Sequence, residues 1–320
     1  MEATTKGIII KGVGGLYSIR LLDDALLPMG SVVQCRARGS FRHEHLTPLP
    51  GDRVTLLCSE GGDNAKENNA ERALVIDEIG ERRNALIRPP LANLDYLFVT
   101  MASAAPTPIL TTVDKLICIA EYNRIEPIIV ITKSELNPAY AKELYDLYTT
   151  AGFTCFSVSA EADEGIEPLK AFIDQNLDGR IAAFAGASGI GKSTLMNRLF
   201  PHLQLSTSAI SRKIERGRHT TRQVDLFPLS DTAGCGYVAD TPGFSMLDFE
   251  RFDFFDKEDL PETMREFLPL IGNCRYTKCS HTKEEGCAIL QAVREGAVPQ
   301  SRHASYVELY DTLKQKKKWN

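Results

Sequence analysis

The stretch "RIAAFAGASGIGKSTLMNRLF", residues 180–200, decides the fold of this chain. Its apolar first part predicts a buried strand, and the part that begins at Lys192 predicts a helix. Between them the residues match the pattern G-x-x-x-x-G-K-[ST], in which glycines allow backbone amides to point at phosphate groups. The stretch therefore predicts a phosphate-binding loop on a strand-to-helix turn.

In loops of this kind the lysine reaches the β- and γ-phosphates, and the hydroxyl after it binds Mg²⁺. We assign these roles to Lys192 and Ser193, and we count Lys192 among the catalytic residues. The nucleotide-binding residues predicted in this loop are Gly186, Ala187, Ser188, Gly189, Ile190, Gly191, Lys192, Ser193 and Thr194.

Strand-like and helix-like segments alternate on both sides of the loop, from about residue 84 to residue 246. Apolar runs such as "DYLFVTMA", "EPIIVIT" and "TCFSVSA" are separated by helical segments such as "AYAKELYDLYTTAG". This alternation is typical of a mostly parallel sheet covered by helices. We therefore predict an α/β nucleotide-binding domain over residues 84–246.

Two segments after the phosphate loop match sequence elements that respond to the γ-phosphate in nucleotide-binding proteins. "YVADTPGF" contains the D-x-x-G arrangement, in which Asp240 supports Mg²⁺ and the amide of Gly243 senses the γ-phosphate. The basic segment "RGRHTTR" predicts a switch loop in which Thr221, or alternatively Thr220, completes the magnesium shell. The predicted magnesium ligands are Ser193, Thr221 and Asp240.

The residues that would read the base lie before the phosphate loop. "IIVITKSEL" contains Thr132, Lys133 and Glu135, which are similar to the [NT]-K-x-D element that recognises guanine in GTPases. "FSVSA" ends with Ser159 and Ala160, where a backbone amide would meet guanine O6. Ordinary GTPases place both elements after the phosphate loop, so the domain resembles a circularly permuted GTPase.

Residues 1–83 contain short strand-like runs broken by glycine turns, which predicts a small β-barrel of the OB type. The segment "CRARGSFRHEH" places basic side chains in this barrel, and we predict that they contact RNA phosphates. The alternative is a solvated surface, and the net charge of −5 argues against a chain that coats nucleic acid throughout. The predicted RNA-binding residues are Arg36, Arg38 and Arg42, supported by His43 and His45.

Residues 247–320 predict a helical domain with a metal site. Four residues follow the pattern C-x₄-C-x-H-x₅-C, namely Cys274, Cys279, His281 and Cys287. Three thiolates and one imidazole complete a tetrahedral zinc site and leave no open position for catalysis, so we predict one structural zinc ion. The other cysteines lie scattered, mostly in apolar runs, and are interpreted as small buried apolar residues.

The start of the chain lacks the features of a signal peptide. The longest apolar runs anywhere in the sequence are much shorter than a membrane span. We therefore expect a protein of the cytoplasm without a membrane partner. As a separate expectation, we take it to be a monomer.

In this combination and order, the chain resembles the RsgA family of small ribosomal subunit biogenesis GTPases. The resemblance spans nearly the whole chain and implies three parts: an OB-type barrel, a circularly permuted GTPase domain, and a zinc-binding helical domain. It also implies a GTPase that the small ribosomal subunit stimulates, and that assists the late maturation of this subunit by contacting its rRNA. The segments that carry the resemblance are "GSFRHEHLTPLPGDRV", "LIRPPLANLDYLFV", "GASGIGKSTLMNRL", "RGRHTT", "DTPGF" and "CRYTKCSHTKEEGCAI".

Three positions depart from this family or from GTPases in general. Glu135 stands where the family usually has aspartate, and its longer side chain weakens the expected preference for GTP over ATP. Arg222 follows Thr221 where the family often has another threonine, and we expect little effect. Phe244 stands where many GTPases have a glutamine that orients water, and a phenyl ring cannot do this.

Another group must therefore position the attacking water, and the resemblance makes His219 in the switch loop the candidate. On chemistry alone, a single histidine in a basic loop more often contacts solvent or RNA. Two other functions stay open from the sequence. One is a nucleotide-gated RNA-binding module with negligible turnover, and the other is an ATPase that acts on another RNA or protein.

Overall fold

The structure is a computed structural model, and it divides the chain into two compact units. Unit 1 comprises residues 1–95, 173–183 and 208–243, and unit 2 comprises residues 96–172, 184–207 and 244–320. The residues that the structure describes are 4–43, 46–59, 73–86, 89–203, 224–230, 232, 235–240 and 255–315.

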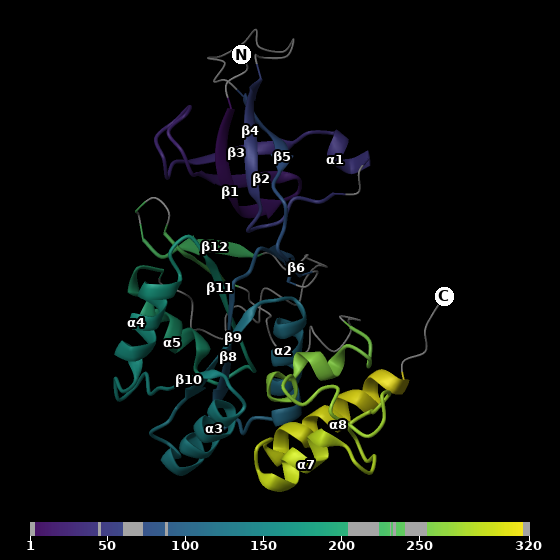
Figure 1. Ribbon diagram of the computed structural model, residues 1–320. Helices are drawn as coiled ribbons and strands as arrows, with labels where there is room; N and C mark the ends of the chain where they lie inside the picture. The colour runs from purple at the N-terminus through teal and green to yellow at the C-terminus, as the bar shows by residue number, and fades with distance from the viewer. Residues whose placement is uncertain are drawn as a thin grey trace, which may run out of the picture. The chain divides into compact units, whose positions relative to one another are not determined.

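Unit 1 contains a five-stranded barrel, which confirms the predicted OB-type fold (Figure 1). Strand β1 pairs antiparallel with β2 and with β4, and β2 pairs antiparallel with β3. Strand β5 closes the barrel because it pairs with both β3 and β4. The five strands are β1 (Thr4–Val13), β2 (Leu16–Leu21), β3 (Val32–Ala37), β4 (Arg53–Ser59) and β5 (Ala73–Ile79).

The barrel core is made of apolar side chains that alternate with outward-facing polar ones along the strands. Ile9, Ile19 and Leu56 are fully buried there. The short helix α1 (Ser40–His43) adds Phe41 to the same core. Strands β1 and β2 are joined by Gly14 and Gly15, which both have positive φ, as a tight two-residue hairpin turn requires.

Further strands of unit 1 extend from the barrel. Strand β12 (Asp225–Pro228) pairs antiparallel with β1, where Lys11 Nζ lies 2.7 Å from Asp225 Oδ2. Strand β13 (Tyr237–Asp240) pairs antiparallel with β12 and parallel with residues 181–183 of β11 (Ile181–Ala185). A small two-stranded sheet consists of β6 (Ala85–Leu86) and β7 (Leu91–Ala92).

Unit 2 contains the parallel sheet that the α/β pattern predicted. Its strand order is β10-β9-β8, with β9 parallel to both of its neighbours, and residues 184–185 of β11 belong to the same unit. Every residue of β8 and β11 is buried, as is typical of strands covered on both faces. The strands are β8 (Tyr96–Ala102), β9 (Glu126–Thr132) and β10 (Thr154–Ser157), and the helical elements are α2 (Leu110–Tyr122), α3 (Pro138–Thr150), α5 (Lys192–Leu199) and η1 (Pro201–Leu203). Helix α4 (Ile166–Asn176) begins in unit 2, and its residues from 173 on belong to unit 1.

The C-terminal part of unit 2 is helical, but its first segment differs from the expectation. The acidic stretch 256–270 reads as helical in the sequence, whereas the structure has only the short 3₁₀ helices η3 (Leu260–Thr263) and η4 (Arg265–Phe267). Pro261 and Pro269 explain this, because proline lacks an amide donor and disfavours a helical residue before it. Two α-helices follow, α7 (Ala288–Glu295) and α8 (Gln300–Gln315).

A buried ion cluster holds α8 against the rest of unit 2. The side chain of Arg302 is fully buried, and its guanidinium lies 2.7 Å from Asp114 of α2 and 2.7 Å from Glu266 of η4. The Tyr148 hydroxyl donates a hydrogen bond to Asp114. Burial alone would lower the pKa of Arg302, but the two carboxylates raise this pKa well above its usual value, so the guanidinium stays charged.

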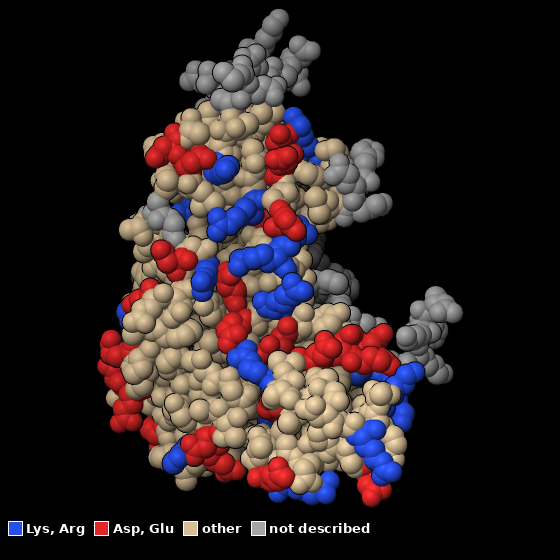
Figure 2. All heavy atoms as spheres, viewed as in Figure 1, with Lys and Arg blue, Asp and Glu red and all other residues tan. Residues whose placement is uncertain are grey.

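The surface carries both signs of charge. Basic and acidic side chains are interspersed over the face shown in Figure 2, so the net charge of −5 does not make this face uniformly acidic. Among the described helices, none is both long enough and apolar enough to cross a membrane.

The division into three domains stays a prediction. The proposed boundary after residue 83 falls within unit 1, and the boundary after residue 246 lies outside the described residues.

We expect Arg302→Ala to lower the free energy of unfolding by about 3–5 kcal/mol, because it leaves two buried carboxylates without their cation. Denaturant unfolding of the full chain measures this change. Arg294→Ala, which removes an exposed arginine from α7, serves as the control and should change the free energy by no more than about 0.5 kcal/mol. Equal effects of the two substitutions would contradict the role of the ion cluster.

Candidate functional site

The phosphate-loop sequence forms the predicted strand, turn and helix. Gly186 directly follows β11, and a Cβ atom at this position would lie only 2.4 Å from the carbonyl and hydroxyl oxygens of Thr100. The same hydroxyl donates a hydrogen bond to Ala185 O at 2.6 Å. Only glycine therefore fits where the loop leaves the sheet.

Two more glycines shape the rest of the loop. Gly189 and Gly191 have φ values of 82° and 89°, a region that favours glycine. Helix α5 begins at Lys192 directly after Gly191, so its first amides and its helix dipole provide a site for an anion. Ser193 lies in the first turn of this helix and is half-buried.

The segments predicted to read a purine base lie at the same sheet edge as the loop. Thr132 is the last residue of β9, and Ser159 lies just after β10. Because β9 and β10 run parallel, these positions share the carboxyl edge of the sheet, where open α/β sheets bind their ligands.

Hydrogen bonds connect the base-reading segment directly to the phosphate loop. The Thr132 hydroxyl donates to Ile190 O at 2.5 Å, and Lys133 Nζ donates to Gly189 O at 2.8 Å. The same ammonium donates to Ala105 O at 2.6 Å. Two segments more than 50 residues apart in the sequence are thus held together, and the segment predicted to read the base precedes the phosphate loop.

Sequence analysis missed Ser103, which helps to shape this segment. Its hydroxyl donates to Lys133 O at 2.7 Å, and its amide donates to Thr132 O at 2.9 Å. These bonds support the left-handed backbone of Lys133, whose φ is 56°. The nearby sequence "MASAAPTP" contains no recognisable motif that could have singled out this serine.

Glu135 carries an unusual carboxylate oxygen. Its Oε2 is buried and has no hydrogen-bond partner among the described residues. A buried carboxylate oxygen without a donor is costly, and a ligand that supplies N–H groups would relieve this cost. The N1–H and N2–H₂ groups of guanine are donors of this kind.

The structure separates the roles of Ser159 and Ala160. The Ser159 amide already donates to Glu164 O at 2.9 Å. Of the two predicted residues, Ala160 therefore has the amide that is available for contact with guanine O6.

The segment after β10 is also connected to α5, the helix that follows the phosphate loop. Arg198 Nε of this helix donates a hydrogen bond to Asp163 Oδ1 at 2.9 Å. Sequence analysis had not identified this last pair.

Several predicted residues cannot be placed in this site. The switch residues His219, Thr220 and Thr221, together with Gly243 and Phe244, lie outside the described residues. Asp240 is the last residue of β13, and its side chain is not described. The predicted magnesium ligands therefore stay a prediction.

Two of the predicted RNA-binding arginines are exposed on the barrel. Arg36 lies in β3, and Arg38 follows this strand and forms an ion pair with Asp77 of β5. Arg42 lies in α1, but its side chain is outside the described part, as are the side chain of His43 and all of His45.

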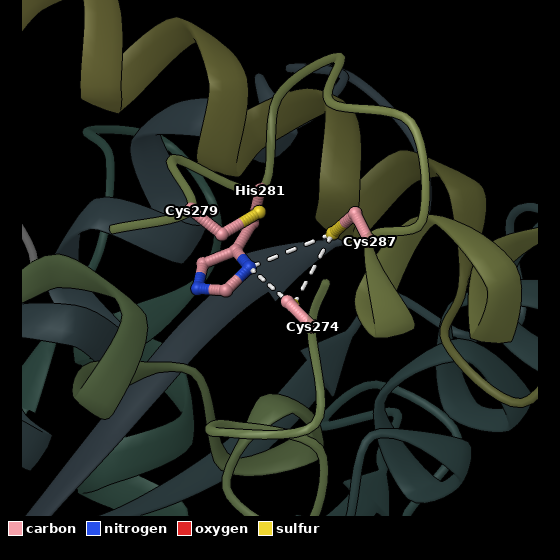
Figure 3. Close-up of side chains that lie close together, drawn as sticks. All are labelled: Cys274, Cys279, His281 and Cys287. Atoms are coloured by element: carbon pink, nitrogen blue, oxygen red, sulfur yellow. Dashed lines mark hydrogen bonds between the residues drawn. The ribbon is translucent and has the colours of Figure 1, made fainter. Parts of the chain in front are cut away.

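The four predicted metal ligands of unit 2 point toward one another (Figure 3). Nδ1 of His281 lies 3.5 Å from the sulfur of Cys274 and 3.5 Å from that of Cys287, and these two sulfurs are 3.9 Å apart. The ligand atoms of all four residues, including Cys279, lie within 4.8 Å of one another. A tetrahedral zinc ion would separate its sulfur ligands by about 3.8 Å and sulfur from nitrogen by about 3.5 Å, so the set fits this metal.

Hydrogen bonds around the cluster orient its members. The amides of Ala288 and Leu290, in the first turn of α7, donate to the sulfurs of Cys274 and Cys287 at 3.3 and 3.5 Å. His303 Nε2 lies 2.8 Å from His281 O. Outer contacts of this kind commonly fix metal ligands.

Glu284 shapes the loop that carries two of these ligands. Partial burial alone would raise the pKa of Glu284, but hydrogen bonds from the Ser280 hydroxyl and from backbone amides lower it to about 2. Glu284 is therefore ionised throughout the physiological pH range. Sequence analysis missed it because an acidic residue beside a cysteine cluster has no distinctive pattern.

The chain is similar to known proteins in both sequence and structure. A family model described as "RsgA GTPase" matches residues 79–250. The chain belongs to the RsgA GTPase family. A second model, "RsgA N-terminal domain", matches residues 6–64.

Curated relatives agree over nearly the full length. A protein of Ruminiclostridium cellulolyticum is 38% identical over 308 residues, which are 96% of this chain and 93% of the relative. A protein of Caldanaerobacter subterraneus is 37% identical over 314 residues, which are 98% and 97% of the two chains. Both are named small ribosomal subunit biogenesis GTPase RsgA.

Two solved structures are similar to the RsgA chain. YjeQ from Thermotoga maritima has a TM-score of 0.77 at 28% identity and covers 98% of this chain and 100% of its own. YloQ, described as a circularly permuted GTPase, has a TM-score of 0.72 at 33% identity, with coverages of 99% and 97%. These likenesses confirm the resemblance, the permuted fold and the assignment of the chain as a GTP hydrolase.

We expect Glu135→Gln to weaken GDP binding by about 10- to 100-fold, because it removes the negative charge and replaces one of the two acceptor oxygens that face the N–H donors of guanine by an NH₂ donor. The substitution should not lower the free energy of unfolding, since Glu135 Oε2 has no described partner to lose. Calorimetric titration and denaturant unfolding measure the two effects. A loss of stability without a loss of affinity would contradict a role in base recognition.

Proposed function

We propose that this chain binds the small ribosomal subunit and assists its late maturation, and that the subunit stimulates it to hydrolyse GTP to GDP and phosphate. The observation that carries this proposal is the hydrogen-bonded connection of Thr132 and Lys133 to the phosphate loop. It supports a single site with a base reader and a phosphate cradle. The names of the relatives support the ribosomal partner.

The nucleotide would be held from both ends. Amides of residues 186–194 and the ammonium of Lys192 would bind the phosphates, and Lys133 would lie along the base. Glu135 would accept the hydrogen bonds of guanine, and Ala160 would donate to O6. Mg²⁺ would be held by Ser193, Thr221 and Asp240 and would neutralise the charge that develops on the phosphates.

Turnover would depend on ordering of the switch loop. Phe244 cannot orient water, so we assign the positioning of the attacking water to His219. Hydrolysis of this kind depends mainly on positioning and electrostatics. The chain alone should therefore turn over slowly until the ribosomal subunit fixes His219.

The cluster of Cys274, Cys279, His281 and Cys287 would hold one structural zinc ion. The four ligands complete a tetrahedron, so the ion would stabilise the C-terminal helical part and take no part in the reaction.

On the barrel, the side chains of Arg36, Arg38 and Arg42 would contact rRNA phosphates. We further propose that the protein acts as a monomer in the cytoplasm, with no membrane partner.

The test is hydrolysis of GTP and ATP, measured side by side with and without purified small ribosomal subunits. The proposal predicts that the subunits strongly stimulate hydrolysis of GTP alone. Equal use of ATP would indicate an ATPase, and slow GTP hydrolysis unchanged by the subunits would indicate a nucleotide-gated binding module. Either result would overturn the proposal.

The same assay tests His219. We expect His219→Ala to lower the stimulated rate by about 100-fold or more without changing GTP affinity, since positioning of water acts only in the reaction. His202→Ala serves as the control because His202 is exposed in η1, and it should retain the rate. Equal rates in both variants would contradict the role of His219.

Zinc is tested separately by elemental analysis of freshly purified protein. We expect one zinc ion per chain, and we expect Cys279→Ser to lose the ion and to lower the free energy of unfolding. Cys58→Ser, at a half-buried cysteine of the barrel, is the control and should retain the metal. Absence of zinc, with no loss of stability on chelation, would contradict the assignment.

A further inference from the structure

The end of β8 carries a buried serine to which the proposed nucleotide contacts give no role. Ser103 directly follows β8 and is only 2% exposed. Its amide donates to Thr132 O at 2.9 Å and so continues the pairing of β8 with β9 by one residue. Its hydroxyl donates to the next carbonyl, Lys133 O, at 2.7 Å. One residue therefore holds two successive carbonyl groups where the base-reading segment leaves the sheet.

The carbonyl of Lys133 is also the group that closes a turn. It accepts a second hydrogen bond, from the Leu136 amide at 3.0 Å, so residues 133–136 form a hydrogen-bonded turn. A carbonyl oxygen has two lone pairs, and these two bonds use both of them. Glu135 lies within this turn. The Ser103 hydroxyl therefore helps to fix the turn that carries the Glu135 carboxylate.

The side chain of Lys133 returns to the same segment after β8. Its ammonium donates to Ala105 O at 2.6 Å, in addition to its bond to Gly189 O of the phosphate loop at 2.8 Å. Residues 103–105 therefore hold Lys133 at both ends, through its backbone carbonyl and through its ammonium. We call residues 103–105 the β8 clamp.

The backbone of Lys133 needs such support. Its φ of 56° lies in the left-handed region, which is unfavourable for a residue with a side chain. If its carbonyl were not held, the turn would also populate ordinary conformations in which Glu135 does not face the base. A site that is competent for binding only part of the time has a proportionally lower affinity. The β8 clamp can therefore raise the affinity for the nucleotide by forming the turn in advance.

We propose that Ser103 is a positioning residue for guanine recognition, which holds the turn 133–136 so that Glu135 meets the donors of the base. This inference rests on the proposed function, in which Glu135 reads guanine. It extends the base-reading machinery to β8, which lies outside the [NT]-K-x-D element. Ser103 acts through Lys133 and Glu135, so its loss should reduce the share of the affinity that depends on the base.

The test is calorimetric titration of the full chain with GDP and with inosine diphosphate, whose base lacks only the amino group of guanine. Ser103→Ala removes the hydroxyl and leaves the carbonyl of Lys133 with one hydrogen bond fewer. We expect this variant to bind GDP about tenfold more weakly and inosine diphosphate less affected, so that its preference for GDP decreases. Ser103→Cys keeps nearly the same volume with a weaker donor, and its preference should lie between those of the unaltered chain and Ser103→Ala.

The control is Thr263→Val, which removes a matching hydroxyl elsewhere in unit 2. Thr263 lies in η3, is also 2% exposed, and its hydroxyl donates to Leu260 O at 2.8 Å. Ser103→Ala and Thr263→Val therefore each remove one buried hydrogen bond from a hydroxyl to a backbone carbonyl. Both should lower the midpoint of denaturant unfolding to a similar extent, whereas only Ser103→Ala should change the preference for GDP.

Two results would overturn this inference alone. If Ser103→Ala bound both nucleotides as the unaltered chain does, or lost affinity for both equally, Ser103 would have only a structural role. If Thr263→Val lowered the preference for GDP as much, the loss would follow from general destabilisation. Equal affinities of the unaltered chain for the two nucleotides would instead overturn guanine reading by Glu135, and this inference with it. Should Ser103→Ala fail to fold, an unchanged preference in Ser103→Cys would overturn the inference.

Discussion

The nucleotide site depends on the hydrogen bonds by which Thr132 and Lys133 hold the phosphate loop. These bonds join the carbonyl groups of Ile190 and Gly189 to the end of β9, across 58 and 56 residues of sequence. The parallel sheet brings the two segments to one edge whatever their order along the chain. A base reader that precedes its phosphate loop can therefore form the same kind of site as one that follows it.

The permuted order also determines what is attached to each part of the GTPase fold. Strand β12, which follows the switch segment in sequence, pairs with β1 of the barrel and is joined to it by Lys11 and Asp225. In unit 2, Arg302 attaches the last helix to Asp114 of α2 through a fully buried ion pair. Within unit 1 strand pairing thus holds β12 to the barrel, and within unit 2 a buried ion pair holds the last helix to α2.

Local sequence patterns predicted much of this structure. The glycines and Lys192 identified the phosphate loop because its backbone conformations and charge need those residue types at fixed spacing. The four metal ligands were predicted for the same reason, because a C-x₄-C-x-H-x₅-C spacing brings them together within a few turns of chain. The barrel and the parallel sheet followed from strand length and alternation, which are also local.

Features that depend on distant contacts could not be predicted. Arg302 looks like any charged residue of an exposed helix until folding surrounds it with Asp114 and Glu266. Ser103 likewise contacts Lys133, 30 residues away in the sequence, only in the folded chain. The acidic stretch before the metal cluster was wrongly read as helical because its composition favours a helix, whereas its prolines limit it to short 3₁₀ turns.

The central claim is that residues before the phosphate loop read guanine. Calorimetric affinities for GDP, inosine diphosphate and ADP test it most directly. Compared with guanine, the base of inosine diphosphate lacks only the amino group that would donate a hydrogen bond to Glu135. Adenine lacks this amino group and also lacks O6. The account predicts that GDP binds most tightly, inosine diphosphate about 10- to 100-fold more weakly, and ADP more weakly still. Equal affinities for GDP and ADP would contradict it.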